Sequence, residues 1–549
     1  MRDTSDGGRG SRLGLAVRTA TPCLSPGPCP PSRSLRRALR SAGLVALCAL
    51  PVLGALGCKA SAADLSLSKE ATDGPVPVVP TPPADGPRLH VLKDVPVLER
   101  PSASGKVIGE LRAGAAVARS AEPYTRSGCD GGWYVVRPKG FVCAGAAATP
   151  IAGAALALPA QPDLARAMPY RYGRARSESI PVYQRAPSVT EQLANEPDLE
   201  KHLARTANDT DPIGASANDV PLDPRGVASG PPVLLPTGEG VDTTGKRTAS
   251  SFFLSGGSEL PPLPSDAVAK GIPLRKGSGV AITRTFLLDG GVRPRAFGLT
   301  PDGKVIPVDR LRPALGSTWN GIDVEKSGLP VAFVHKRGVT TWTLSRGKAV
   351  QHEDGEVERR SAVSLSGKFR TVEGVRFEQT REGPWLRSQD IVVIVKRSKF
   401  PDFVAGTQKW IDISLANQTL TAYEGRKPIF ATLISSGRDQ IGDPQTTAST
   451  ARGTFKVQRK LVTRGIDPRE VYSSFDVADA PWVLEFEQGH AITGNYWSDA
   501  MGEAQGYHNV ALSPIDARRI WTWADPQLPE GWHGVVAEGG ESTIVFVRN

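Results

Sequence analysis

The segment spanning residues 489–517 gathers side chains that could carry out acid–base or nucleophilic chemistry. It reads GHAITGNYWSDAMGEAQGYHNVALSPIDA, and its reactive candidates are His490, Ser498, Asp499, Tyr507 and His508. A hydroxyl becomes a nucleophile only beside a hydrogen-bonded base, an arrangement that a sequence does not specify. A metal site built from His490, His508 and Asp499 is a further alternative, but no known ligand spacing supports it.

Thiol chemistry is the alternative that the composition restricts most. The chain has six cysteines, and none lies after residue 143: Cys23, Cys29, Cys48, Cys58, Cys129 and Cys143. A cysteine is a strong nucleophile as its thiolate, held ionised by a neighbouring imidazole. A cysteine mechanism in the 489–517 segment is therefore excluded unless an N-terminal thiol folds back onto it.

This same segment resembles the catalytic segment of the L,D-transpeptidases, the YkuD family, with the catalytic residues replaced. The family carries Ile-His-Gly and then, further along, Ser-His-Gly-Cys before a hydrophobic strand. An ungapped match through Val510, Leu512, Ser513 and Pro514 places Gly506 at the Ser position, Tyr507 at the His, His508 at the Gly and Asn509 at the nucleophilic Cys. Upstream, Thr493 takes the position of the other His.

The resemblance extends over residues 408–549. The run from Lys409 to Gly437 matches the opening hairpins, and STARGTFKVQRK matches an element that forms one wall of the family's substrate groove. The resemblance implies a groove contributed by Gly453, Phe455, His490, Gly494, Tyr496, Trp497 and His508. A neutral Asn amide cannot replace a thiolate, so we expect no intact catalytic residue and no cofactor or metal.

The N-terminus has the pattern of an export signal. Arg36, Arg37 and Arg40 precede an apolar run over 42–57, which is too short for a membrane span. The following ALGC resembles a lipobox, which implies diacylation of Cys58; a soluble signal cleaved nearby is the alternative. We therefore assign residues 1–58 to a signal or lipoprotein signal. Residues 59–87 are rich in Ala, Ser and Pro, lack aromatic residues, and are expected to form a disordered tether.

Residues 88–146 show short alternating runs bounded by Gly and Pro, which predict a small β-barrel. The order of these runs resembles a bacterial SH3 domain, a module that binds wall peptides or acts as a spacer. Cys129 and Cys143 flank its last hairpin, and an oxidising envelope would pair them. Two free thiols are the alternative.

The middle of the chain is less regular. Residues 147–265 are predicted to be linker with partly ordered segments, including two strand-like runs within 170–187. Residues 266–400 return to a β pattern that is compatible with further SH3-like modules.

Together, these patterns predict a mainly β protein with small barrels, and the resemblance implies that its C-terminal domain is a YkuD-type β-sandwich with a few short helices. The net charge of +10 does not indicate nucleic-acid binding, because eight Arg and two Asp of residues 1–58 supply +6 of it. The resemblance implies an envelope protein, lipid-anchored in the periplasm, that binds peptidoglycan or its stem peptides without catalysis. An active enzyme with a nucleophile other than Cys is the alternative.

Overall fold

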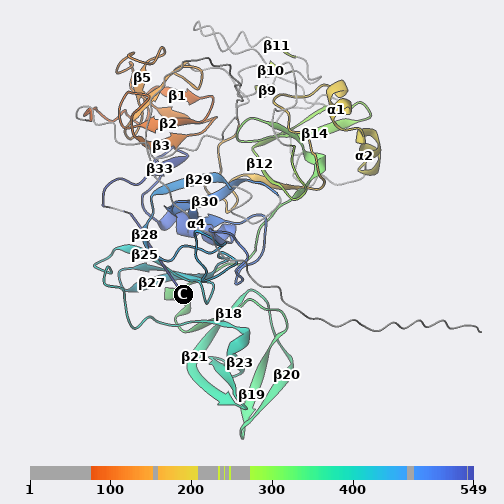
Figure 1. The fold of residues 1–549 in the computed structure, drawn as a ribbon, viewed down its shortest axis with the longest axis vertical. Coiled ribbons are helices and arrows are strands. Elements are labelled where there is room, and N and C mark those ends of the chain that lie inside the picture. Colours follow the sequence, from red (N-terminus) through yellow and green to blue (C-terminus); the bar gives the residue numbers. More distant parts are fainter. Residues whose placement is uncertain are drawn as a thin grey trace, which may run out of the picture. The chain divides into compact units, whose positions relative to one another are not determined.

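The computed structural model describes residues 76–151, 159–207, 273–466, 475–540 and 542–549, together with the backbone of three two-residue strands, β9 (Val233–Leu234), β10 (Gly240–Val241) and β11 (Arg247–Thr248). Cys58 and the predicted signal lie outside the described residues, as does the tether before residue 76. Strands predominate over a few short helices, which confirms the predicted mainly β class (Figure 1). No helix of the described part is long and apolar enough to cross a membrane.

The first module is a compact set of seven short strands: β1 (Arg88–Val91), β2 (Val95–Leu98), β3 (Val107–Leu111), β4 (Ala116–Ala118), β5 (Trp133–Val135), β6 (Phe141–Cys143) and β7 (Ala148–Thr149). One sheet has the order β4-β1-β7, and β3-β2-β6-β5 forms the other group of paired strands. Alternating residues such as Leu89, Val91 and Val97 fill the core between them. A disulfide joins Cys129 to Cys143 beside this core.

The second module contains part of the predicted linker. It comprises β8 (Arg171–Ala175), α1 (Val189–Asn195), α2 (Leu199–Arg205), β12 (Gly279–Ile282), β13 (Arg284–Asp289), β14 (Pro294–Leu299), β15 (Val305–Pro307), the 3₁₀ helix η1 (Val308–Arg310) and β16 (Leu311–Pro313). Strand β8 pairs with both β12 and β16. A capping box, in which Ser188 and Glu191 bond each other's backbone, begins α1. Arg295 has no exposed side-chain surface, and it pairs with Glu196 and Asp309 to fasten these helices to β14.

The third module is a seven-stranded antiparallel sheet of order β20-β19-β23-β22-β21-β18-β24. Its elements are β18 (Val331–Val334), β19 (Val339–Ser345), β20 (Lys348–Val357), β21 (Ser361–Val372), β22 (Val375–Thr380), β23 (Trp385–Arg387), the 3₁₀ helix η2 (Ser388–Asp390) and β24 (Val392–Ile394). Before it come β17 (Ile322–Asp323) and α3 (Val324–Ser327). Because β17 pairs with β27, this segment extends a sheet of the C-terminal domain.

The C-terminal domain is the predicted β-sandwich. Its elements are β25 (Lys409–Ser414), β26 (Thr419–Glu424), β27 (Lys427–Leu433), β28 (Gly453–Lys456), β29 (Arg459–Ile466), β30 (Val477–Glu487), β31 (His490–Gly494), β32 (Val510–Leu512), α4 (Pro514–Trp523), β33 (Gly534–Val536) and β34 (Ile544–Arg548). One sheet has the order β17-β27-β26-β25-β34-β28, and β33, β29, β30, β31 and β32 follow one another in the second. Ile411, Leu420, Trp482 and Val510 lie in the core between them, because alternate residues of each strand face inward.

Backbone pairing joins the modules to the second sheet of the sandwich. Strand β3 of the first module pairs with β33, and β12 of the second module pairs with β30. Trp532 completes the core of the first module and donates its indole N–H to the Arg137 carbonyl at 2.8 Å. A side chain at Gly109 would collide with the Trp532 ring, since a Cβ there would lie 2.1 Å from it. The glycine therefore permits this docking.

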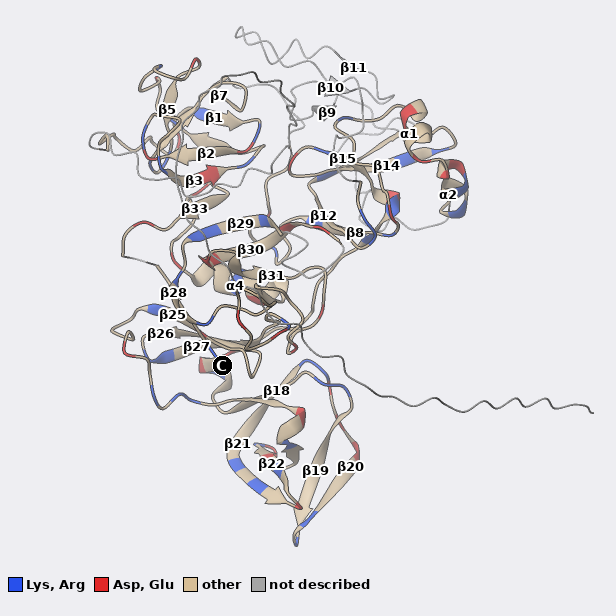
Figure 2. Ribbon diagram, viewed as in Figure 1, with Lys and Arg blue, Asp and Glu red and all other residues tan. Residues whose placement is uncertain are grey.

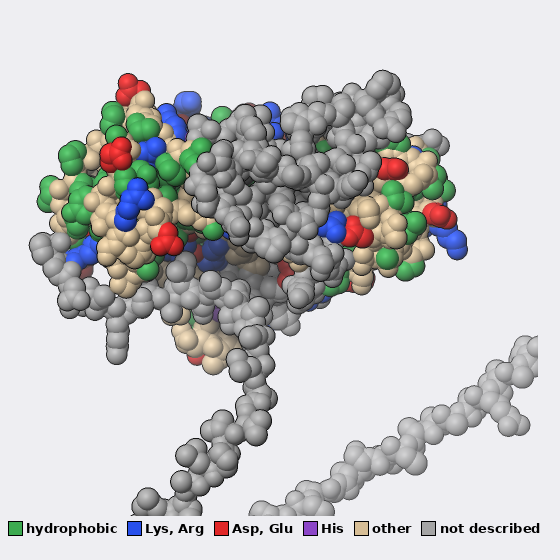
Figure 3. All heavy atoms as spheres, turned by 90° about the horizontal axis from the view of Figure 1, so that it is seen from above, with side chains coloured by type: hydrophobic (Ala, Val, Ile, Leu, Met, Phe, Trp, Pro, Cys, Tyr) green, Lys and Arg blue, Asp and Glu red, His purple; other side chains and the backbone are tan. Residues whose placement is uncertain are grey.

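Acidic and basic residues are interspersed over the ribbons of these modules (Figure 2). On the face seen from above, charged side chains likewise alternate with apolar ones over the described parts (Figure 3). This mixture is the pattern of an ordinary protein surface.

Candidate functional site

Asn509, the predicted position of the nucleophile, lies where two parallel strands meet. Strands β31 and β32 pair through Ile492 with Val510 and Thr493 with Ala511. Asn509 directly precedes β32, and its side-chain oxygen Oδ1 accepts the Ala491 N–H at 2.9 Å. A buried N–H needs a partner. The Asn509 amide supplies that partner just where the backbone pairing of the two strands ends.

Thr493, predicted to take the position of the family's upstream His, is closed to solvent. Its exposed fraction is 0%, and its hydroxyl has no hydrogen-bond partner among the described residues. A hydroxyl without a neighbouring base cannot lose its proton to become a nucleophile. Thr493 therefore offers neither the base of the family mechanism nor a substitute nucleophile.

The rings of the two histidines, His490 and His508, contact each other in a tilted arrangement. The rings of His490 and His508 have centroids 4.7 Å apart, and the Tyr507 ring lies 4.1 Å from His508. His490 Nδ1 lies 3.2 Å from the His508 carbonyl oxygen, while His508 Nε2 lies 3.2 Å from the Thr447 carbonyl oxygen. Burial lowers the pKa of His490, so this imidazole is neutral at pH 7. The hydrogen-bond contacts of these two ring nitrogens are therefore with main-chain atoms.

A loop between β27 and β28 covers this cluster. Ser435 pairs with Ala511 and Gly437 with Gly506 through isolated bridges. At Gly437 a Cβ would lie 2.2 Å from the Ala448 carbonyl oxygen and 2.3 Å from that of Tyr507, so only glycine allows this approach. The loop explains why Asn509 is only 5% exposed. Of the predicted catalytic positions, Thr493 and Asn509 are buried, whereas Tyr507 is half-buried.

An aromatic row connects the predicted groove wall to the histidines. Phe455, on β28, has its ring 5.4 Å from Phe486, which lies 6.2 Å from His490. Gly453 has φ of +144°, a conformation that favours glycine at the start of β28. Sequence reasoning missed Phe486, although its place in the alternating run before His490 marks it as inward-facing. Phe455, Tyr507 and His508 are half-buried and form the accessible rim.

Three predicted groove residues lie elsewhere. Gly494 is buried against Pro481 and Ala517. Tyr496 is 2% exposed and donates its hydroxyl to the Ala478 carbonyl, with its ring 4.2 Å from that of Tyr172 on β8. The Trp497 carbonyl accepts a hydrogen bond from Arg174, also on β8, at 2.8 Å. These contacts anchor the second module, and a residue as buried as Tyr496 cannot line an open groove.

The remaining candidate residues, Asp499 and Ser498, have other partners. Asp499 forms ion pairs with Arg359 and Arg360 of the third module. The Ser498 backbone N–H is held by the Asn495 side chain at 2.8 Å. Within the described ranges, no group of three or more His, Cys, Asp or Glu residues could hold a metal ion.

Comparison with known proteins gives matches to solved structures alone. No protein-family model matches the chain, and no curated protein sequence does. Similar structures include an L,D-transpeptidase from Xylanimonas cellulosilytica (20% identity, 27% of this chain and 65% of that chain, TM-score 0.20) and one from Stackebrandtia nassauensis (18%, 28% and 62%, 0.20). The L,D-transpeptidase from Mycobacterium smegmatis is 16% identical over 40% of this chain and 96% of that chain, with a TM-score of 0.21. The chain spans less than two thirds of the first two.

Proposed function

We propose that this protein is a non-catalytic relative of the L,D-transpeptidases that binds peptidoglycan or its stem peptides at the cell envelope. The observation that carries the proposal is Asn509, which stands at the nucleophile position and bonds the backbone of β31 through its amide. The replacement of both family imidazoles by Thr493 and Tyr507 supports the same conclusion.

Location at the envelope rests on two features of the chain. The disulfide between Cys129 and Cys143 is typical of proteins that fold in an oxidising compartment. The Arg-rich segment and the ALGC sequence then imply export and a diacylated Cys58, with the SH3-like module as a second wall-binding element. Mass spectrometry of the mature N-terminus tests the anchor; an unmodified start elsewhere than Cys58 removes it.

Binding is expected at the rim rather than at the buried positions. Phe455, Tyr507 and His508 are half-buried, and the rings of Tyr507 and His508 lie 4.1 Å apart. The Tyr507 and His508 rings combine apolar area with polar atoms, which suits a peptide with short side chains. Thr493 and Asn509, in contrast, are buried.

The test uses purified full chain and muropeptides bearing tetrapeptide stems. We expect saturable binding by calorimetry, with no mass increase of the protein and no dimeric muropeptide product. Tyr507→Ala together with His508→Ala should weaken binding, whereas Phe369→Ala, on an exposed ring of the third module, should leave it unchanged. An adduct or a dimeric product lost in Asn509→Ala would instead establish the alternative, an active enzyme with a nucleophile other than Cys.

Restoration of the family motif is the converse experiment. Thr493→His, Tyr507→His, His508→Gly and Asn509→Cys together return the residues that hold and ionise a thiolate. Gain of transpeptidation would show that only the chemistry had been lost. If the folded variant does not react, the groove itself has diverged together with the chemistry.

A further inference from the structure

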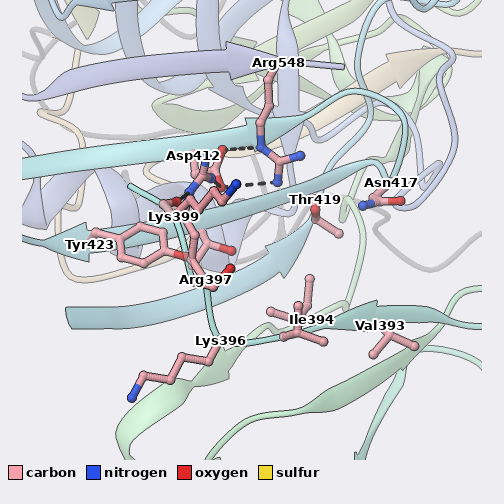
Figure 4. A pocket seen from close by; sticks show the side chains of 13 residues that line it. Val393, Ile394, Lys396, Arg397, Lys399, Asp412, Asn417, Thr419, Tyr423 and Arg548 are labelled. Atoms are coloured by element: carbon pink, nitrogen blue, oxygen red, sulfur yellow. Dashed lines mark hydrogen bonds and ion pairs between the residues drawn. The ribbon is translucent and has the colours of Figure 1, made fainter. Parts of the chain in front are cut away.

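A cavity of about 350 Å³ lies on the C-terminal domain between β24, the outer face of the β25–β26 hairpin and residues 395–404, which we call the strap. Figure 4 shows its lining side chains. The strap is fixed by aromatic packing, because the Phe403 ring lies 5.7 Å from Trp410 and 5.9 Å from Phe546. A volume of this size is at the lower end of the range for small-molecule sites.

The cavity has a surplus of positive charge. Its cationic residues are Lys396, Arg397, Lys399 and Arg548, and its one anionic residue is Asp412, so four charges against one leave +3. Both arginines converge on Asp412, which is 5% exposed; Arg548 Nε lies 2.8 Å from Oδ1, and Arg397 contacts Oδ2 (Figure 4). One carboxylate cannot neutralise two guanidinium groups.

Two further contacts hold the Arg397 side chain in this position. Its Nε donates to the Lys399 carbonyl at 2.7 Å, and its guanidinium lies over the Trp410 ring at 5.8 Å. The Arg397 side chain is 20% exposed, whereas the Arg548 side chain is 39% exposed. A partly buried charge without full compensation favours an anion brought from solution.

Hydroxyl groups line the sheet side of the same cavity. Thr419, Thr421 and Tyr423 come from one face of β26, and in the part of the chain that the structure describes their hydroxyls form no hydrogen bond. Burial raises the pKa of Tyr423 to about 12, so its phenol keeps the proton and can donate. The Asn417 side-chain amide lies at the edge of the cavity, and Lys396 extends away from the ion-paired cluster (Figure 4).

We propose that this cavity binds a small hydroxylated anion, a sugar-sized molecule that carries one carboxylate or phosphate. The anionic group would lie against Lys399 and the surplus guanidinium charge, and the ligand hydroxyls would pair with Thr419, Thr421 and Tyr423. The site is separate from the rim around Tyr507 and does not depend on stem-peptide binding there.

Calorimetry on the full chain tests this site with three probes of similar size: glucuronate, glucose 1-phosphate and glucose. We expect glucuronate or glucose 1-phosphate to bind, more weakly at high salt, and glucose not to bind. Binding of one charged probe alone identifies a carboxylate or a phosphate as the preferred group. Failure of both, or equal binding of glucose, overturns the proposal.

Matched substitutions then place the binding in this cavity. Lys399→Gln removes an exposed cation without touching the Asp412 pairs, and it should weaken binding about tenfold, as expected for one charge-assisted hydrogen bond. Lys368→Gln, on exposed β21, is the control and should bind like the parent. Thr421→Val should also weaken binding at an unchanged melting temperature. Parent-like affinity in both cavity variants would contradict the assignment.

Discussion

Two polar clusters, one within the C-terminal domain and one between that domain and the first module, differ in how their groups are paired. In the catalytic-position cluster, named for the predicted positions (Thr493, Asn509, His490 and His508), the side chains of Asn509, His490 and His508 contact backbone groups, and the Thr493 hydroxyl has no partner among the described residues. In the interface cluster (Arg112, Thr463, Asp479 and His533), charged side chains from two modules bond each other. Buried charge is therefore retained where modules dock, whereas the catalytic-position cluster is held by neutral main-chain groups.

The geometry of the interface cluster explains how it tolerates buried charge. Arg112, after β3, lies 2.5 Å from the Asp479 carboxylate, and their side chains are only 11% and 10% exposed. The Thr463 hydroxyl accepts from Arg112 at 2.6 Å and donates to Asp479 at 2.9 Å. Although burial opposes the charge, the Asp479 carboxylate holds the pKa of Arg112 above its ordinary value. The ion pair is thus buried between the first module and the sandwich.

The largest expected effect comes from removal of one member of that pair. Arg112→Met leaves the Asp479 carboxylate buried without its counter-charge, which should cost about 3–5 kcal/mol of unfolding free energy. Denaturant titration measures the loss, and Arg88→Met, at an exposed position of the same module, should change it little. Adding Asp479→Asn to Arg112→Met should recover part of the stability. If the unfolding free energy does not recover, the unpaired Asp479 charge is not the cause of the loss.

The next effect is a dependence of stability on pH at the same interface. Burial lowers the pKa of His533 from 6.5 to about 3, so the folded chain keeps this imidazole neutral. Its Nε2 lies 3.0 Å from the Thr463 carbonyl and donates to it, while Nδ1 has no partner among the described residues. Between about pH 6.5 and 3, the unfolded chain therefore binds more protons, and stability falls as the pH falls through this window.

Thermal unfolding between pH 7 and 4 measures this dependence. His533→Gln keeps an amide N–H for the Thr463 carbonyl but does not titrate, so its curve should be flatter than that of the parent. An equal slope in both proteins would assign the acid sensitivity to other groups.

A smaller loss is expected in the catalytic-position cluster, because only a neutral hydrogen bond is at stake. Asn509→Ala leaves the Ala491 N–H buried without an acceptor, which should cost about 1–3 kcal/mol of unfolding free energy. Asn195→Ala, at the exposed end of α1, is the control. Unchanged stability in Asn509→Ala would show that the amide is not part of the β31–β32 junction and would reopen a functional role for it.

The resemblance over residues 408–549 implied this sandwich, with its opening hairpins between Lys409 and Gly437. Within the β25–β26 hairpin, Ile411, Ile413, Leu420 and Ala422 share one face, and all four lie in the core. The closing of the catalytic positions was not predictable, since it depends on the isolated bridge from Gly437 to Gly506. Local patterns give strands and their faces, whereas contacts between distant strands follow from pairing that no single segment encodes.

The groove residues show the same limit. The resemblance implied that Tyr496 lines the groove, but its ring lies 4.2 Å from that of Tyr172 on β8. The pairing of β12 with β30 brings this second module alongside, with more than a hundred residues between those strands. The interface cluster has the same origin, because Arg112 and Asp479 meet only when β3 pairs with β33.

The smallest effect should be a gain in stability at Thr493. Its buried hydroxyl has no partner in the described structure, and desolvating such a group opposes folding. Thr493→Val replaces the hydroxyl with a methyl group of similar size and should raise the unfolding free energy by about 1 kcal/mol. Thr493→Ser keeps the hydroxyl, loses the methyl group and should destabilise the domain. If Thr493→Val instead destabilises the protein or abolishes muropeptide binding, the hydroxyl has a partner or a role, and the contrast between the neutral and the charged cluster fails.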